Sequence, residues 1–207
     1  MKIKFLKTIF LLGLVSSSLT SCVGDDDYVI PTVNEYAFKE GFESAPTGSG
    51  SNEVAISLTG WINYNATATR LWHARTYSNN IYAEFSSFYS APGTNDVAWL
   101  ITPAIDLTAT SGEILSFNTK TRFYSNGYPL TAFISTNYNG TTAGIATATW
   151  TPLTFTTPTA EDVFVNSGNI DISAFESNNV RIAFKYTGSK AGVTTTLQLD
   201  NIKITKN

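Results

Sequence analysis

Short runs of alternating apolar and polar residues are the feature that most constrains the fold of this 207-residue chain. The clearest run is residues 180–186, where Val, Ile, Phe and Tyr occupy every second position. Successive side chains of a strand point to opposite faces, so this pattern predicts a strand with one face in the core and one in solvent. Four more segments have the same pattern: residues 98–101, 114–117, 130–136 and 197–204.

Clusters of turn-forming residues separate these segments. They lie at residues 92–95, 125–127, 138–140 and 187–189. Only residues 172–176 indicate a helical turn, and the abundance of Thr, Ser, Asn, Tyr and Phe favours strands. The sequence therefore predicts an all-β domain built as a two-sheet sandwich.

The first 21 residues have the organisation of a bacterial signal peptide. Three lysines precede an apolar run at residues 9–15, which is too short to span about 30 Å of hydrocarbon. Residues 19–22, Leu-Thr-Ser-Cys, resemble a lipobox, and this resemblance implies cleavage after residue 21 and lipidation of Cys22. The alternative is an ordinary secretory signal.

Residues 22–35 are predicted to form an acidic flexible tether, and residues 36–207 a single domain. The run Asp25-Asp26-Asp27 stays solvated, as in a linker. It also resembles the export signal that sends Bacteroidetes lipoproteins to the outer face of the outer membrane. On that interpretation the protein is anchored in the outer membrane and exposed at the cell surface.

Cysteine count and charge exclude several classes of protein. Cys22 is the only cysteine, so no intramolecular disulfide can stabilise the fold. Removing residues 1–21 leaves 10 basic and 16 acidic residues, a net charge of −6. Nucleic-acid binding is not expected, because it requires a basic surface that neutralises phosphates.

Four segments, taken in order, carry a resemblance to a known family. They are residues 38–44 (FKEGFES), 60–61 (GW), 98–107 (AWLITPAIDL) and 199–204 (LDNIKI). This order resembles the choice-of-anchor J domains of Bacteroidetes surface proteins, which are similar to the cleaved adhesin domains of gingipain-type haemagglutinins and, more distantly, to MAM and carbohydrate-binding domains. The resemblance implies a galactose-binding-like jelly-roll β-sandwich, display at the surface and no catalytic residues.

The two ends of the domain carry acidic residues that are candidates for a metal site. Leu197 and Leu199 alternate on one parity and Ile202 and Ile204 on the other, which predicts a bulge or bend near Asp200. A buried carboxylate needs a partner, and calcium prefers oxygen ligands.

The resemblance implies a structural calcium ion between the first and last strands, held by Glu43 and Asp200, with Glu40 as the alternative glutamate. The other interpretation is that Asp200 caps a bend while the glutamates face water.

No catalytic residue is predicted. His73 is the only histidine, and no Gly-x-Ser-x-Gly motif accompanies it. A zinc site requires several nitrogen or sulfur ligands. A glycosidase requires two facing carboxylates, and the sequence does not pair the available acids.

Aromatic residues are the most abundant candidates for ligand contacts. The four tryptophans, Trp72 among them, are large enough to fill a sandwich core. Rings in loops can instead stack on sugars or form a protein-binding patch. The candidate ligand contacts are Arg122, Tyr124, Tyr128 and Trp72.

These observations predict a non-catalytic, lipid-anchored surface protein whose β-sandwich binds a ligand or mediates adhesion. The alternative is a glycan-binding component of a surface polysaccharide-utilisation system, and a hydrolase is the third hypothesis. The expected partners are a membrane, through the lipid, and a glycan or surface protein.

Overall fold

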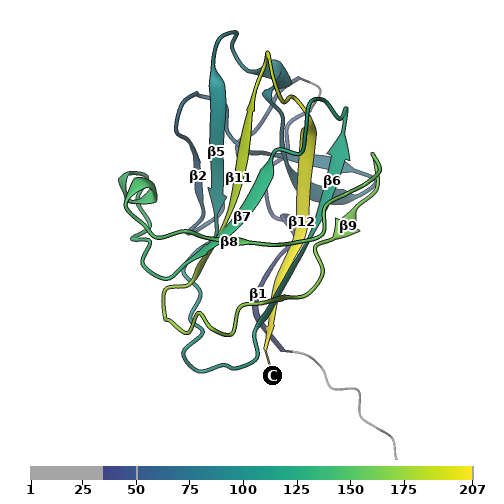
Figure 1. Cartoon of the computed structure of the whole chain (residues 1–207). Helices are drawn as coiled ribbons and strands as arrows, with labels where there is room; N and C mark the ends of the chain where they lie inside the picture. Colours follow the sequence, from purple (N-terminus) through teal and green to yellow (C-terminus); the bar gives the residue numbers. More distant parts are fainter. Residues whose placement is uncertain (1–34, 50, 207) are drawn as a thin grey trace, which may run out of the picture. The chain divides into compact units, whose positions relative to one another are not determined.

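Two antiparallel β-sheets make up the described part of the chain, residues 35–49 and 51–206 of the computed structural model (Figure 1). The predicted signal peptide, Cys22 and nearly all of the predicted tether lie outside these residues. The elements are β1 (Glu35–Glu40), β2 (Ile62–Asn65), β3 (His73–Tyr77), β4 (Asn80–Phe85), the 3-10 helix η1 (Ser87–Tyr89), β5 (Asn95–Ile101), β6 (Ile114–Arg122), β7 (Leu130–Ser135), the 3-10 helix η2 (Ala143–Ala146), β8 (Thr151–Leu153), β9 (Val165–Asn166), β10 (Ile170–Asp171), β11 (Arg181–Ser189) and β12 (Thr196–Lys206).

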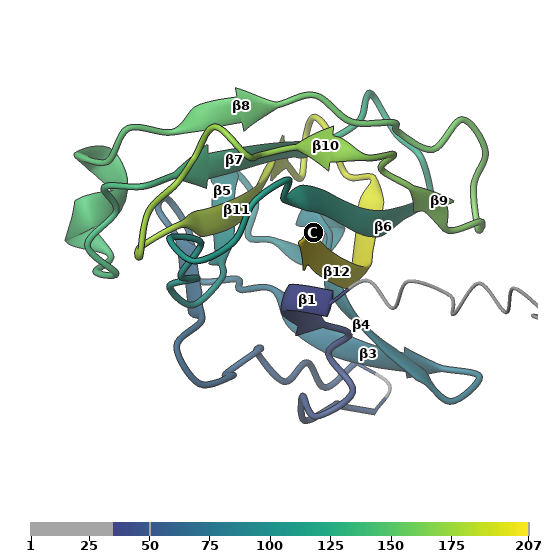
Figure 2. The same ribbon diagram turned by 90° about the horizontal axis from the view of Figure 1, so that it is seen from below.

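The larger sheet has seven strands in the order β10-β6-β12-β4-β3, with β9 paired to β6 and β1 paired to β12. Figure 2 shows β1 beside β12. The smaller sheet has five strands in the order β2-β5-β11-β7-β8. This arrangement confirms the predicted all-β jelly-roll sandwich.

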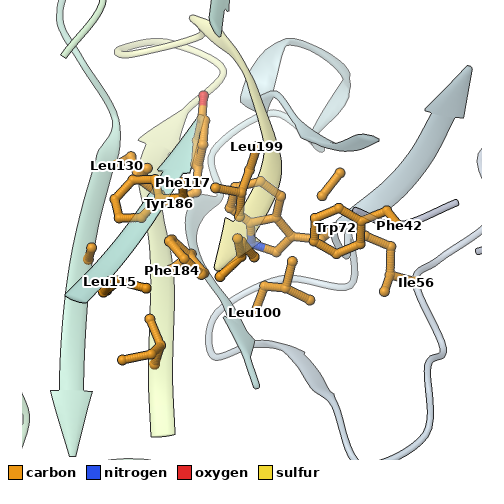
Figure 3. Close-up of a cluster of buried hydrophobic side chains, with 14 of the residues drawn as sticks. Phe42, Ile56, Trp72, Leu100, Leu115, Phe117, Leu130, Phe184, Tyr186 and Leu199 are labelled. Carbon is orange, nitrogen blue, oxygen red and sulfur yellow. The ribbon is translucent and has the colours of Figure 1, made fainter. Parts of the chain in front are cut away.

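The core lies between the two sheets and is rich in aromatic residues (Figure 3). Phe117 and Phe184 meet edge to face with ring centroids 5.0 Å apart, and both are fully buried. Trp72 packs against Phe85 and Tyr186. Large rings from both sheets thus fill the space that the inward parity of the strands creates.

The predicted strand parity is confirmed in β11. Ile182, Phe184 and Tyr186 are buried on the core side, while Lys185 lies on the other face with its ammonium group over Trp99 and Phe133. The outer face of the smaller sheet also carries a second apolar cluster, in which Trp99 contacts Trp150.

The predicted bulge in the last strand is also present. The pairing of β12 with β6 shifts register between Asp200 and Lys203, and Asn201 has a positive φ of 52°. The extra residue reverses the parity of β12, so Leu199 and Ile202 both face the core.

One local prediction is wrong. Residues 187–189 are not a turn: they extend β11 and pair with residues 95–97 of β5, and the turn follows at residues 190–192. Cross-strand hydrogen bonds there outweigh the turn preference of Gly188.

Residues 172–176 form a turn with a hydrogen bond from Phe175 N to Ile172 O, without a helix.

Within residues 35–49 and 51–206, no helix has the length and apolar character needed to cross a membrane.

Candidate functional site

A row of polar side chains crosses the outer face of the larger sheet. The strand registers align His73 of β3 with Glu84 of β4, Glu84 with Gln198 of β12, and Gln198 with Lys120 of β6. The neighbours of these residues along each strand face the core, so the row lies on the opposite face. His73, Gln198 and Lys120 are nevertheless buried, because the side chains of this face cover one another.

Glu84 is the centre of this row. Its carboxylate accepts a hydrogen bond from Gln198 Nε2 at 2.7 Å and lies 3.4 Å from both His73 Nε2 and Arg75 Nε. Burial by itself would raise the pKa of Glu84, but the hydrogen bonds from His73 and Gln198, with the charge of Arg75, lower it below the ordinary value. Glu84 is therefore a fixed, ionised acceptor.

A groove of about 540 Å³ lies on this face, and Glu84 is the member of the row that lines it. Arg75, Tyr82 and Glu84 form part of its floor, and Arg122 and the aromatic rings line it. Seven large hydrophobic side chains are exposed among the described residues, and four of them line this groove: Tyr77, Phe88, Tyr89 and Phe123. Their fractional exposures are 57–71%, so the groove concentrates apolar surface that folding leaves in water.

Local backbone structure positions these rings. Tyr77 ends β3 next to a two-residue turn in which Ser78 and Asn79 both have positive φ, as in a type I′ hairpin. Phe88 and Tyr89 belong to η1, whose N-cap Ser86 accepts a hydrogen bond from Phe88 N at 3.3 Å.

Cations lie against two of the rings that line the groove. Arg70 lies over Tyr89, with 5.3 Å from the guanidinium carbon to the ring centroid, and Arg122 lies over Phe123 at 5.2 Å. These contacts hold the rings at the rim of the groove.

A second groove of about 310 Å³ adjoins the first and shares Tyr77 and Tyr82 with it. Lys120 lies in this second groove, with its Nζ 5.4 Å from the Tyr82 ring centroid and 4.6 Å from that of Phe164. Burial lowers the pKa of Lys120, and the charge of Arg122 lowers it further, against the opposing charges of Asp162 and Glu84. Asp200 is also among the residues of this groove.

Of the candidate metal ligands, Glu40 is the last residue of β1, Glu43 lies three residues beyond it, and Asp200 lies within β12 at its bulge. Asp200 accepts hydrogen bonds from Asn80 Nδ2 at 3.0 Å and from Asn201 N at 2.6 Å. Burial raises its pKa above the ordinary value, and although these bonds oppose the shift, the charge of Glu43 adds to it. Glu43 is exposed, with its carboxylate 3.4 Å from Ile81 N, while Glu40 accepts from Phe42 N at 2.6 Å.

Carboxylate oxygens are the ligands that a hard cation such as calcium prefers, so Asp200 and Glu43 have the right chemical type for a calcium site. However, no cluster of three or more His, Cys, Asp or Glu side chains in the described residues could hold a metal. The hydrogen bond from Asn201 N also fits the alternative, in which Asp200 caps the bulge.

The four predicted ligand contacts do not lie together in the structure. Arg122 lines the main groove, and Tyr124 is exposed beside a different hollow, next to Glu161. Tyr128 packs against Phe155, and burial raises its pKa to about 12.

Trp72 needs correction as a ligand contact. It is fully buried, and its Nε1 donates to Ala98 O at 3.2 Å, because its ring completes the core between the sheets.

Tyr77, Phe88, Tyr89 and Phe123 line the groove but were not among the four candidate ligand contacts. Each lies near a turn in an otherwise core-forming sequence, which is a usable but unspecific signal. Nothing in the sequence indicated that four polar residues of this face lie together, because only strand register brings them there. They are Arg75, Glu84, Lys120 and Gln198.

The sequence matches the profile of a family described as "Domain of unknown function (DUF5017)" over residues 65–206. No curated protein matches the sequence. Among solved structures, the K3 cleaved adhesin domain of Lys-gingipain from Porphyromonas gingivalis W83 is similar at 17% identity and a TM-score of 0.50, covering 83% of this chain and 99% of that domain.

Two more solved domains have lower TM-scores. The K1 cleaved adhesin domain of the same gingipain has 16% identity and a TM-score of 0.48, covering 82% of this chain and 98% of that one. The CBM22-1 xylan-binding domain of Paenibacillus barcinonensis Xyn10C has 10% identity and a TM-score of 0.45, covering 84% and 95%. The likeness to the K3 domain, at 17% identity, indicates a shared fold alone.

Proposed function

This chain belongs to the DUF5017 family, and we propose that its domain binds a glycan, without catalysis, in the groove on the outer face of the larger sheet. The observation that carries the proposal is the set of four exposed aromatic rings around one groove: Tyr77, Phe88, Tyr89 and Phe123. Exposed apolar patches of this kind, rimmed by polar groups, mark binding sites.

The groove offers both kinds of contact that a sugar needs. Aromatic rings pack on the apolar faces of sugar rings, and fixed polar groups bind hydroxyls. Glu84 supplies an ionised acceptor held by Gln198 and His73, and Arg75 and Arg122 supply donors. Because these polar groups are already held by neighbouring side chains, little ordering is needed when a ligand binds.

The two adjoining grooves favour an internal stretch of a glycan chain over a single sugar. They share Tyr77 and Tyr82, so one ligand can pass from the first groove into the second. We expect affinity to rise with the length of the oligosaccharide until both grooves are filled, because each added sugar buries further ring surface.

The chemistry of the groove favours binding over hydrolysis. Among the residues that line the main groove, Glu84 is the one that carries a carboxylate, and its pKa is lowered. A glycosidase needs a second, facing carboxylate and an acid that stays protonated near neutral pH. Glu84 is not such an acid, and no second carboxylate of the described residues lines the main groove beside it; Asp200, whose pKa is raised, lines the second groove.

Two further parts of the proposal rest on residues near the chain start and on β12. We infer that Cys22 carries lipid and holds the domain at the cell surface of an outer membrane, as its lipobox-like context indicates.

We also infer that Asp200 and Glu43 hold a calcium ion, because the negative charge of Glu43 beside the buried Asp200 disfavours two free carboxylates.

The test is glycan-array binding by the full-length protein in detergent micelles, followed by affinity measurements on the variants Tyr77→Ala and Tyr89→Ala. Each loss of a stacking ring should weaken binding by about tenfold, the equivalent of an aromatic contact.

Tyr124→Ala is the matched control, because Tyr124 is similarly exposed but lies outside the groove. Binding that depends on Tyr124 and not on Tyr77 would place the ligand elsewhere. A chain that binds no glycan at all would refute the proposal and favour a protein ligand.

A further inference from the structure

Lys120 is a buried cation that lacks a matching anion. It is 9% exposed and lies between the rings of Tyr82 and Phe164. Within residues 35–206, no carboxylate forms an ion pair with it. Its Nζ is not among the buried side-chain nitrogens that lack a hydrogen bond, so the ammonium group reaches the groove, where the two rings are its nearest charge-stabilising neighbours.

The other cations that line the grooves differ from Lys120 in forming ion pairs. Arg75 lies near both Glu84 and Glu53, and Arg122 forms an ion pair with Asp162 at 2.6 Å. Of the three cations that line the two grooves, Lys120 is therefore the one that forms no ion pair within the described residues. Its pKa, lowered mainly by burial, is consistent with a cation that gains from a new anion.

Lys120 also lies on the path that the proposed ligand takes from the first groove into the second. It lines the second groove together with Tyr77 and Tyr82, the two residues that this groove shares with the first. Asp200 belongs to the same groove, but it pairs with Asn118 in the strand register, two positions along β6 from Lys120, and Asn80 donates to it. In the strand register, Asp200 is thus displaced from Lys120 by two residues, or roughly 7 Å along β6.

We propose, on the basis of the glycan-binding function above, that the groove selects an anionic glycan and that Lys120 pairs with a carboxylate or sulfate group of one of its sugars. The sugar ring packs on Tyr77, the exposed ring that both grooves share, and its anionic group lies beside the ammonium of Lys120. Arg75 and Arg122 add donors in the first groove, where the next sugars of the chain bind.

The acidity of the protein makes this proposal specific. Residues 22–207 carry a net charge of −6, so no general attraction for polyanions is expected. Tight binding of a charged glycan must then come from a direct contact. An acidic peptide could in principle use the same cation, but the open rings of Tyr77, Phe88 and Tyr89 suit the flat faces of sugars.

The experiment compares charged and neutral forms of the same backbone, using the full-length protein in detergent micelles. Polygalacturonate is paired with its methyl ester, alginate with its propylene glycol ester, and dextran sulfate with dextran. The wild type should bind the charged form of at least one pair about tenfold or more tighter, as expected for a charge-assisted contact. The uronate and sulfate pairs distinguish the two sources of negative charge.

Lys120→Met should bring the affinities for the charged and neutral forms to about the same value, and Lys120→Arg should restore part of the preference. Lys39→Met, an exposed lysine on β1, is the matched control. If Lys120→Met does not fold, Lys120→Gln and the loss of the wild-type preference at raised ionic strength replace it.

Equal affinity for charged and neutral forms, or a preference that survives Lys120→Met, would overturn the proposal while glycan binding stands. Binding of poly-glutamate but of no glycan would overturn both proposals.

Discussion

Gln198 Nε2 donates a hydrogen bond of 2.7 Å to the carboxylate of Glu84, although 114 residues separate the two in sequence. Gln198 is fully buried on β12, and Glu84 lies opposite it on β4. The contact fixes the carboxylate at the floor of the main groove, where His73 and Arg75 also approach it. The polar floor of the groove is therefore part of the folded sheet rather than of a loop.

The Glu84→Gln variant should be less stable than the wild type at neutral pH. The pKa of Glu84 is lowered in the folded state, so its ionised form contributes stability that is present above the ordinary pKa of 4.5 and is lost as pH falls through the folded value. The difference in unfolding free energy between wild type and variant should thus shrink in acid. Urea unfolding from pH 7 to pH 3 measures it, with the exposed Glu176→Gln as control. A difference that stays constant with pH would contradict this assignment.

Phe184→Ala should destabilise the domain by about 3–5 kcal/mol, the usual range for a buried phenylalanine. Phe184 is fully buried and packs edge to face against Phe117. Phe123→Ala, which removes a ring that is 71% exposed, should change stability by no more than about 0.5 kcal/mol. Chemical unfolding of both variants is the measurement. A loss below about 1 kcal/mol for Phe184 would show that the core tolerates the cavity, contrary to its close packing.

Calcium should raise the melting temperature of the wild type relative to chelator. An ion that binds only the folded state stabilises it by about 2.7 kcal/mol at a hundredfold excess over Kd. Asp200→Asn should remove this effect, because it deletes the buried carboxylate beside Glu43. The control is Asp171→Asn, an exposed acid on β10. If wild-type midpoints with calcium and chelator are identical, Asp200 serves only to cap the bulge through Asn201 N.

In chelator, the effect of pH on the unfolding free energy that comes from Asp200 should be opposite to the effect that comes from Glu84. Its pKa is raised in the folded state, so the unfolding free energy decreases as pH rises from its ordinary value of 3.8 through the folded value. Asp200→Asn should lack this decrease, and unfolding of both proteins in chelator across that range tests it. Equal pH profiles would mean that the carboxylate stays solvated.

Cys22→Ala should lose lipid when the full-length protein is expressed in a bacterium that processes lipoproteins. Cys22 is the only cysteine and directly follows Leu-Thr-Ser. Metabolic labelling with a radioactive fatty acid, with membrane fractionation, compares it with the wild type. Ser21→Ala, which keeps the thiol, is the control and should stay labelled. Equal labelling of Cys22→Ala and wild type would exclude this anchor.

The local features of the fold were predictable because they depend on neighbouring residues. Strand alternation has a period of two, so residues 180–186 alone identify the buried face of β11. The parity change between Leu199 and Ile202 likewise predicts the bulge at Asp200. Where a local preference met a long-range partner, as at Gly188, the partner strand prevailed.

The groove was decided by tertiary structure. His73, Glu84, Gln198 and Lys120 come from four strands, and only the strand order and register of the larger sheet place them in one row. Tertiary structure also decided the role of Trp72. A tryptophan can fill a core or form a ligand surface, and Trp72 is buried because the opposite sheet packs Tyr186 against it. The sequence by itself thus determined which residues form strands and which way they face, because backbone geometry repeats locally. Which faces meet, and which charges remain without a partner, depends on contacts between residues far apart in the chain, and only packing sets those.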